Sequence, residues 1–258
     1  MKIPIYVISL LRDKERRENI QFNFSNLGID FQFFDAIDAK DGRNAELINK
    51  MRFSGLGNVM TDGEIACTLS HQFVYKDIVE RQYEWAIVLE DDVIVDYRFK
   101  DFLKSLNINE YEKLKKDNLY LLGGMKDLHD YPVIGVSFFN YVKVGCRKFR
   151  RVNWNQRKIR RACCYLMNNL MSQQLLELTK NSGTYRADSW KYIHQCGIIK
   201  DFYIDEFIYH PPVNENNSNL ESERREVSGE KRSRSKLQKQ LKILRSWAKC
   251  IFFSLFFK

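Results

Sequence analysis

One apolar stretch that ends in three consecutive acidic residues constrains the fold of this chain more than any other feature. Residues 85–89 read Trp-Ala-Ile-Val-Leu, and Glu90, Asp91 and Asp92 follow directly. A run so rich in aromatic, β-branched and aliphatic residues is typical of a strand that is buried on both faces. Successive side chains of a strand point to opposite faces, so we expect Glu90 and Asp92 on one side and Asp91 on the other.

The acidic run has two interpretations. Such runs are usually solvated turns, and that is the plainer one. Three like charges at the end of a buried strand, however, repel one another and are costly to desolvate unless a cation neutralises them. Mn²⁺ and Mg²⁺ prefer oxygen ligands and usually keep waters or substrate phosphates in their remaining positions. The second interpretation therefore predicts a divalent metal site, with Asp92 and Glu90 as ligands.

The chain before this stretch has the pattern of a βαβ unit. We expect a strand over residues 3–10, a helix over 13–27 that ends at Gly28, and a second strand over 31–34. This order predicts a parallel sheet that binds ligands at the carboxyl ends of its strands. The residues expected on the same edge as Glu90 are Ser9, Leu10, Arg12 and Ala36. Arg12 and Arg16 either meet a nucleotide diphosphate there or are ordinary surface charges.

A longer helix is expected immediately before the apolar stretch. Thr61 and Glu64 have the spacing of a capping box, and the helix should run from residue 62 to about 83. Ser70 and His71 fall in its middle. A histidine inside an amphipathic helix is more often a packing residue than a ligand, and only the strand that follows makes His71 a candidate for the site.

Composition limits what the chain can be. Its 258 residues suffice for one substantial α/β domain with an appendage, and its formal net charge is +9. Most of that excess lies after residue 220, so it does not by itself indicate a nucleic-acid-binding domain. The six cysteines lack metal-binding spacing, which favours reduced thiols in a cytosolic protein. The apolar run over residues 3–11 passes straight into charged residues, so we expect a strand rather than a signal peptide.

Together these motifs resemble, in order and spacing, those of the family 25 glycosyltransferases. The matching segments are Ile8-Ser9-Leu10 with Arg12 and Arg16, Phe34-Asp35-Ala36, Gly63-Glu64-Ile65-Ala66-Cys67 with Leu69-Ser70-His71, and Leu89-Glu90-Asp91-Asp92. The family contains bacterial lipopolysaccharide and lipooligosaccharide galactosyltransferases and is related to the collagen galactosyltransferases. The resemblance is close over about residues 3–95 and fainter to about residue 213. Ser9 stands where the family usually has Asn.

The resemblance implies an α/β fold of the GT-A type, a single Rossmann-like domain with a mostly parallel central sheet. It also implies an inverting transfer, usually from UDP-galactose with a divalent metal, Mn²⁺ or Mg²⁺. Asp92 would hold the cation, and Glu90 or Asp91 would touch the ribose or order the metal's waters. The residues expected to bind the donor are Ser9, Leu10, Arg12, Arg16, Ala36, Ser70, His71 and Glu90.

The segment after the carboxylates is harder to interpret. Residues 131–136 and 141–146 are expected to pair as a hairpin. Residues 147–161 hold eight Lys or Arg with Phe149 and Trp154 interleaved. This segment is a mobile lid over the donor diphosphate, an acceptor loop that meets phosphorylated core oligosaccharide, or a plain solvated loop. Basic residues with aromatics also bind single-stranded nucleic acid.

Three residues of the second half are carried over from the resemblance. Tyr165 matches a family tyrosine weakly, since Cys163-Cys164 departs from the family pattern. Asp188 matches an aspartate that would act as general base or bind the acceptor; otherwise it caps a helix over residues 189–195. His210 lies where enzymes of the GT-A type often supply a third metal ligand.

The end of the chain predicts a different kind of contact. We expect a catalytic domain over residues 1–213, a polar linker over 214–230, and a basic amphipathic helix over 231–258. The final apolar segment has about eleven residues, against the ~20 that a membrane-spanning helix requires. We therefore expect it to lie on an anionic membrane surface, at the cytoplasmic face of the inner membrane. The rival interpretation is a helix that packs on the core or dimerises.

These expectations combine into one functional hypothesis. The chain is a metal-dependent inverting glycosyltransferase that transfers galactose from UDP-galactose to a lipid-linked oligosaccharide in a bacterium. One alternative is a transferase for another nucleotide-sugar. The other, from a different class, is a membrane-associated nucleic-acid-binding module that uses residues 147–161, and we consider this alternative weaker.

Overall fold

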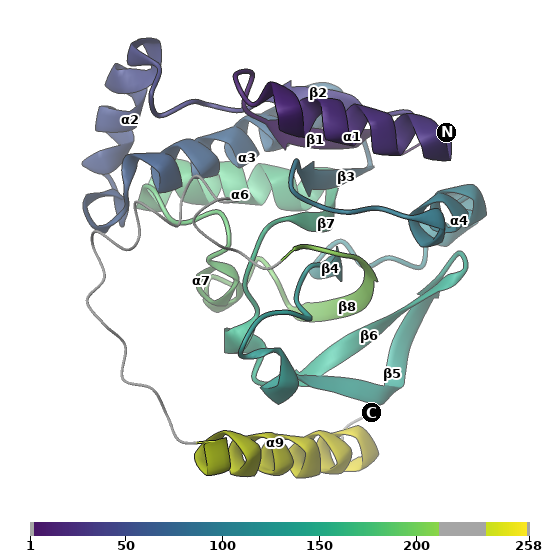
Figure 1. The fold of residues 1–258 in the computed structure, drawn as a ribbon. Helices are drawn as coiled ribbons and strands as arrows, with labels where there is room; N and C mark the ends of the chain where they lie inside the picture. Colours follow the sequence, from purple (N-terminus) through teal and green to yellow (C-terminus); the bar gives the residue numbers. More distant parts are fainter. Residues whose placement is uncertain (1–2, 212–235, 257–258) are drawn as a thin grey trace.

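The computed structural model describes residues 3–211 and 236–256, which build an α/β fold around one eight-stranded sheet (Figure 1). The strands are β1 (Ile5–Ser9), β2 (Gln32–Asp35), β3 (Trp85–Glu90), β4 (Asn118–Gly123), β5 (Gly135–Val144), β6 (Arg147–Trp154), β7 (Cys164–Asn168) and β8 (Asp201–Ile208). The helices are α1 (Lys14–Leu27), α2 (Ala45–Arg52), α3 (Asp62–Glu80), α4 (Tyr97–Ser105), α5 (Ile108–Tyr111), α6 (Asn169–Ser182), α7 (Trp190–Gln195) and α9 (Lys236–Phe256).

The strand order is β2-β1-β3-β7-β4-β8-β6-β5. Parallel pairs join β1 to β2, β1 to β3 and β4 to β8, whereas β7 lies antiparallel between β3 and β4. The predicted α/β class is confirmed. The expectation of a mostly parallel sheet holds for β2-β1-β3 and β4-β8 but not for the whole sheet, since β7, β6 and β5 pair antiparallel. Buried central strands are apolar on both faces in either direction, so composition does not reveal this.

The apolar run over residues 85–89 forms β3, and all five of these residues are buried. Ala86 and Val88 belong to a core cluster shared with residues of α3 and α6. Ile87 and Leu89 belong to a second cluster, shared with residues of α1 and α4. Helices therefore cover both faces of β3, as the continuous apolar run requires. The carboxylates that follow therefore lie at the edge of the sheet formed by the carboxyl ends of β1 and β3, rather than on one of its faces.

Two local signals in the sequence are confirmed. Gly28 ends α1 with a left-handed φ of 63°, a conformation that glycine adopts at little cost. The N–H of Glu64 donates to Thr61 Oγ1 at 3.1 Å, and the N–H of Thr61 donates to Glu64 Oε2 at 3.2 Å. This reciprocal capping box fixes the start of α3, the helix that carries Ser70 and His71.

The predicted hairpin over residues 131–136 and 141–146 is wrong in register. The observed hairpin pairs β5 with β6 and turns at Gly145 and Cys146, so the segment expected to turn, 137–140, lies within β5. The basic segment 147–161 is correspondingly not a loop over its whole length, because its first eight residues form β6. Phe149 and Val152 are the buried residues of β6. They lie three positions apart, so the sequence of β6 does not show the usual alternation of a strand.

The expected C-terminal helix is present as α9, which lies against β5, β6 and the short turn of helix Tyr131–Val133 (Figure 1). Ser246 Oγ donates to the carbonyl of Val133 at 2.6 Å, and Cys250 Sγ donates to that of Val136 at 3.1 Å. Packing on the core, the rival interpretation, is therefore observed for one face of the helix. Within residues 3–211 and 236–256, no helix is long and apolar enough to cross a membrane. The predicted linker 214–230 lies outside the described residues, and the three-part division of the chain stays a prediction.

The aromatic core beneath the β5–β6 hairpin generates a test of this fold. Phe149 is fully buried, and its ring centroid lies 5.9 Å from that of Phe102, 5.8 Å from that of Tyr120 and 6.2 Å from that of Phe207. We expect Phe149→Ala to lower the free energy of unfolding by about 3–5 kcal/mol, because it leaves a cavity. Urea denaturation followed by circular dichroism measures this loss. Phe139→Ala on the neighbouring strand, where the side chain is exposed, should cost less than about 0.5 kcal/mol.

Candidate functional site

Ten of the predicted site residues line one pocket, which encloses about 850 Å³ of space, part of it open solvent. They are Ser9, Leu10, Arg12, Arg16, Ala36, Ser70, His71, Glu90, Asp91 and Asp92. They gather because β1 and β3 are parallel neighbours that end at the same edge, with Ile8 opposite Glu90 in the register. The pocket has the size of a small-molecule site. Asp188 and His210 are not among its lining residues.

The wall built by the ends of β1 and β2 is held by backbone and short side-chain contacts. The N–H of Ala36 donates to the carbonyl of Ser9 at 2.9 Å, and the next backbone N–H donates to Ser70 Oγ at 2.9 Å. Arg12 Nε lies 2.7 Å from Asp38 Oδ2, and its side chain is 38% exposed. Ser70 therefore fixes the wall to α3, while Arg12 keeps exposed surface at the mouth of the pocket.

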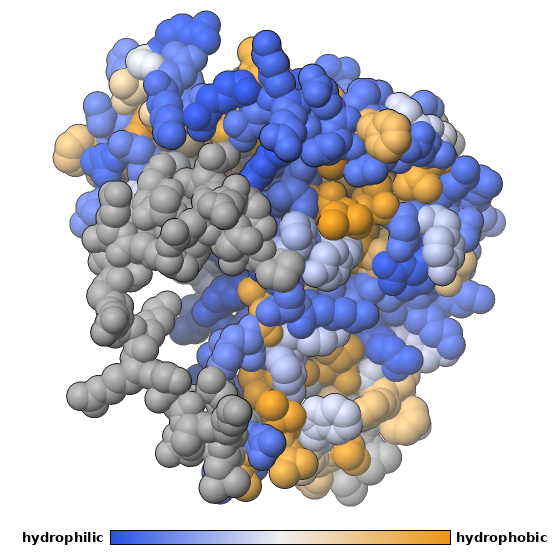
Figure 2. All heavy atoms as spheres, viewed as in Figure 1, coloured by the Kyte–Doolittle hydropathy of each residue, from blue (hydrophilic) through white to orange (hydrophobic). Residues whose placement is uncertain are grey.

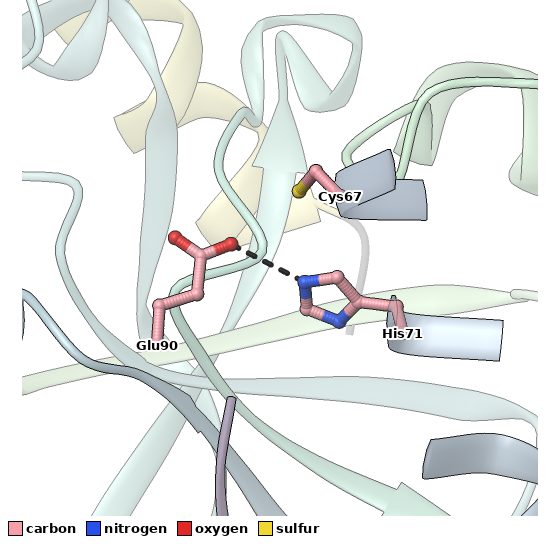
Figure 3. Close-up of side chains that lie close together, drawn as sticks. All are labelled: Cys67, His71 and Glu90. Carbon is pink, nitrogen blue, oxygen red and sulfur yellow. Dashed lines mark hydrogen bonds and ion pairs between the residues drawn. The ribbon is translucent and has the colours of Figure 1, made fainter. Parts of the chain in front are cut away.

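Glu90 is held by a chain of buried hydrogen bonds that begins with His71 of α3 (Figure 3). His71 Nε2 lies 3.2 Å from Glu90 Oε1, His71 Nδ1 lies 2.7 Å from Tyr165 Oη, and that hydroxyl lies 2.9 Å from Tyr75 Oη. One arrangement of hydrogens satisfies the chain: Tyr75 donates to Tyr165, Tyr165 to His71, and His71 to Glu90. Burial raises the pKa of both tyrosines, so they remain protonated donors at neutral pH.

The same place is a second potential metal centre. The ligand atoms of Cys67, His71 and Glu90 lie within 4.8 Å of one another, and Figure 3 shows the three side chains pointing toward one another. A thiol beside an imidazole favours softer metals such as Zn²⁺ over Mn²⁺ or Mg²⁺. Both ring nitrogens of His71 already have hydrogen-bonding partners, so the geometry is satisfied without any ion. We therefore interpret it as a support for Glu90.

Asp91 is bound by the first strand and the first helix. Ser9 Oγ donates to Asp91 Oδ2 at 2.7 Å, and an Arg16 guanidinium nitrogen donates to Asp91 Oδ1 at 2.8 Å. Burial raises the pKa of Asp91, while the charge of Arg16 and the bond from Ser9 limit the rise. Asp91 Oδ1 thus positions Arg16 beside the pocket while Oδ2 is bound to Ser9, and a direct catalytic role for Asp91 stays a prediction.

Asp92 points away from both neighbours and meets His210. Its Oδ2 lies 3.2 Å from His210 Nε2, while His210 Nδ1 donates to the carbonyl of Pro211 at 2.6 Å. The backbones of Ile94 and Tyr209 form a bridge that brings the two segments together. Burial opposes the charge on each group, but their mutual contact prevails: it lowers the pKa of Asp92 and raises that of His210.

Asp92 Oδ1 is buried and has no hydrogen-bond partner among the described residues. An unsatisfied carboxylate oxygen is costly unless a ligand completes it. Asp92 Oδ1 offers a free oxygen donor of the kind that Mn²⁺ accepts, and His210 Nε2 would offer a nitrogen donor once the imidazole is neutral and the ion replaces its contact with Asp92 Oδ2, with waters or phosphate oxygens in the remaining positions. The residues therefore fit a divalent cation.

The expected set of metal ligands needs one correction. Within the described part of the chain, the donor atoms of Asp92, Glu90 and His210 do not gather within 4.8 Å of one another. The strand ends at Glu90, and the turn that follows sends the three carboxylates to three partners rather than alternating them across a sheet. Asp92 and His210 come together, whereas Glu90 turns toward His71.

Arg161 is a residue of this edge that the sequence did not single out. It lies next to the start of β7, where the N–H of Glu90 donates to the carbonyl of Cys163. The N–H of Arg161 donates to Asp188 Oδ2 at 3.2 Å, and its carbonyl accepts from Trp190 Nε1 at 2.8 Å. These contacts hold it at a left-handed φ of 64°, which is unfavourable for a non-glycine residue.

Arg161 also supplies charge near the metal candidate. Its guanidinium bonds both oxygens of Asp127 at 2.7 and 2.9 Å and the carbonyl of Gly124 at 2.6 Å, and its charge helps to lower the pKa of Asp92. Asp188 thus fixes the backbone that carries Arg161. Ser189, not Asp188, occupies the N-cap position of α7, where it makes no side-chain capping hydrogen bond, and the Asp188 side chain bonds the N–H of Arg161 instead.

Glu206 of β8 was also missed, because nothing in the sequence marks it. It lies in a small cleft with His210, and the N–H of Met125 donates to it at 3.2–3.3 Å. Burial raises the pKa of Glu206 to about 7, although the N–H of Met125 opposes the rise. A long-range contact of this kind leaves no pattern in the local sequence.

This shift predicts a pH dependence of stability. The folded chain holds a proton on Glu206 up to about pH 7, whereas the unfolded chain releases it near 4.5, so stability falls as pH rises between these values. Glu206→Gln keeps the shape but does not titrate. We expect the variant to gain about 3 kcal/mol relative to the unmodified chain between pH 4.5 and 8, measured by urea unfolding. A constant difference across this range would contradict the prediction.

Comparison with known proteins agrees with the motifs. Residues 2–190 match the model of glycosyltransferase family 25 (LPS biosynthesis protein). A glycosyltransferase 25 family member of Aedes aegypti is 36% identical over 107 residues, which are 39% of this chain and 17% of that protein. Procollagen galactosyltransferase 2 of Homo sapiens is 32% identical over 112 residues, 41% of this chain and 18% of that protein. The lipooligosaccharide biosynthesis protein lic2B of Haemophilus influenzae is 36% identical over 98 residues, 38% of this chain and 36% of that protein.

The matches therefore span less than two fifths of the length of each of these relatives. Among solved structures, a glycosyltransferase involved in the glycosylation of the major capsid of PBCV-1 covers 83% of this chain, with 9% identity and a TM-score of 0.41; the match spans 95% of that chain. The family match extends over most of the sequence and includes every motif from β1 to the carboxylates. This chain belongs to glycosyltransferase family 25.

Proposed function

We propose that this chain transfers galactose from UDP-galactose to a sugar of a lipooligosaccharide or lipopolysaccharide acceptor, with inversion and with a divalent cation. The observation that carries the proposal is the buried, unpartnered Oδ1 of Asp92 beside His210, next to a pocket that also holds Arg12 and Arg16. A cation site at the rim of a nucleotide-sized pocket is the arrangement that a diphosphate donor requires.

Each group at this edge has a separate task. Asp92 and His210 would hold the cation, which when bound offsets the negative charge that develops on the UDP leaving group. Arg16, positioned by Asp91, adds fixed positive charge at the pocket wall. The ends of β1 and β2 form the remaining wall, against which the nucleoside would lie. Glu90, oriented by His71, would accept hydrogen bonds from the ribose hydroxyls.

Inversion needs a base that takes the proton of the attacking acceptor hydroxyl. We retain Asp188 for this role. Its support is its place beside Arg161, on the same edge as Asp92, although one of its oxygens accepts the Arg161 N–H. Glu206 is a second carboxylate near His210, and a comparison of Asp188→Asn with Glu206→Gln would distinguish the two.

The choice of sugar and acceptor rests on relatives. Two of the relatives named above bear on it: one is a procollagen galactosyltransferase and the other a lipooligosaccharide biosynthesis protein. A different nucleotide-sugar is the alternative within the same chemistry. The nucleic-acid-binding alternative is disfavoured because four of the eight basic residues of segment 147–161 contact carboxylates. They are Arg147 with Asp205, Arg151 with Asp201, Lys158 with Asp130, and Arg161 with Asp127.

The metal role of Asp92 can be tested directly. Purified protein is incubated with a panel of UDP-sugars and Mn²⁺, and UDP release is followed. We expect release with UDP-galactose and a decrease of at least about 100-fold in Asp92→Asn, because the cation loses its carboxylate ligand. The variant should also lose the thermal stabilisation that UDP with Mn²⁺ gives the unmodified chain. Asp101→Asn, at an exposed position of α4, is the matched control and should behave as the unmodified chain does.

The hydrogen-bonded side chains of Tyr75, Tyr165 and His71 behind Glu90 give a second test. Tyr165→Phe removes the hydroxyl that orients His71 while keeping the ring, so we expect about a tenfold loss in kcat/KM for the donor. Tyr6→Phe is the control, since it removes the hydroxyl of another buried tyrosine, bonded to Asp77 outside the pocket. Equal effects of the two variants on the kinetics would show that the hydrogen bonds from Tyr75 to Glu90 support only the fold.

A further inference from the structure

The apolar stripe of α9 is not buried. Its large apolar side chains are roughly half exposed or more, with Leu244 at 66% and Trp247 at 59%. The members of this stripe are Leu241, Leu244, Trp247 and Ile251. A helix that completes the core of its own domain turns such a stripe inward. Here the stripe stays exposed instead.

The helix packs on the domain through another face. Ser246 and Cys250 are its buried residues, and both donate hydrogen bonds to carbonyls next to the β5–β6 hairpin or within it. Ile243, at the matching helical spacing, is half-buried. Because small and polar side chains make the contact, the attachment leaves the apolar stripe free to bind something else.

Further exposed apolar side chains lie on β5, the strand against which α9 packs. Cys250 bonds to Val136 of β5, and the two residues Phe138 and Phe139 that follow on this strand are 50% and 65% exposed. Figure 2 shows hydrophobic residues gathered at the lower end of the molecule, where Figure 1 places α9 and the hairpin. Exposed apolar side chains gathered at one end of a molecule mark a candidate interaction site.

The charge around the stripe is of one sign. Residues 231–258 contain nine Lys or Arg and no Asp or Glu. Of those whose side chains are described, Arg245 and Lys249 are exposed, and Lys249 Nζ lies 4.2 Å above the Trp154 ring. We propose that the α9 stripe, with Phe138 and Phe139, is a docking surface for an anionic lipid bilayer, which takes up the apolar side chains and attracts the basic ones.

A second copy of this chain is the competing occupant. Pairing through the same stripe would bring two tails together, each with nine basic and no acidic residues. Like charges at such an interface oppose association. A bilayer that contains anionic lipid has the complementary charge and also accommodates tryptophan at its interface. The charge pattern therefore favours lipid over a dimer.

The full chain is tested by co-sedimentation with vesicles of phosphatidylcholine alone and of phosphatidylcholine with phosphatidylglycerol. We expect binding to the anionic vesicles that weakens with added salt, and little binding to the neutral ones. Leu244→Glu combined with Trp247→Glu should weaken binding by more than about tenfold, because two large apolar side chains leave the interface. Both positions are exposed, so the variant should keep the circular dichroism and melting temperature of the unmodified chain.

Phe53→Glu is the matched control. Phe53 is 86% exposed and follows α2, at the opposite end of the molecule from α9 (Figure 1). Unchanged vesicle binding in the double variant, or equal loss in Phe53→Glu, would overturn the proposal. So would a dimer, detected by light scattering, that dissociates in the double variant. These measurements need no sugar donor, so their failure is distinguishable from failure of the proposed transferase reaction.

Discussion

Three neighbouring carboxylates meet at the end of β3, and their mutual repulsion at a partly buried edge is the condition that the surrounding structure satisfies. The three side chains point apart, and this reduces the repulsion between them. Each carboxylate contacts a partner from a different element. The pairs are Glu90 with His71 of α3, Asp91 with Arg16 of α1, and Asp92 with His210 after β8. The order of strands in the sheet brings these three elements to one edge, so the fold and the electrostatics of the site depend on each other.

Much of the pocket at the end of β3 could be predicted from sequence because its residues lie next to strand ends. An apolar run predicts a buried strand, and the residues that follow it must lie where the strands of the sheet end. Ser9 and Ala36 are of this kind, and the capping box at Thr61 similarly fixes the helix that carries His71. The family resemblance, confirmed by comparison, covers the same local motifs.

The rest of the edge comes from long-range pairing that has no local signature. β7 enters antiparallel between β3 and β4, and this brings Arg161 and Tyr165 to the carboxylates although they are distant in the sequence. The basic segment 147–161 looked like a loop because arginines occupy positions of a strand, and the structure shows why they are tolerated. Arg147 and Arg151 of β6 pair with Asp205 and Asp201 of the neighbouring β8. Opposite charges on adjacent strands replace the apolar alternation that sequence analysis relies on.

The charge at the site leads to a requirement for the donor. A diphosphate would bring further negative charge to an edge that already holds three carboxylates. Arg12 and Arg16 do not offset it fully, because they face Asp38 and Asp91, whose charges they already balance. Asp92 keeps one buried oxygen that no residue in the described part of the chain contacts by a hydrogen bond. A divalent cation there would satisfy that oxygen and make the edge able to accept a diphosphate, so this one buried oxygen links the architecture of β3 to the nucleotide-sugar donor that we propose.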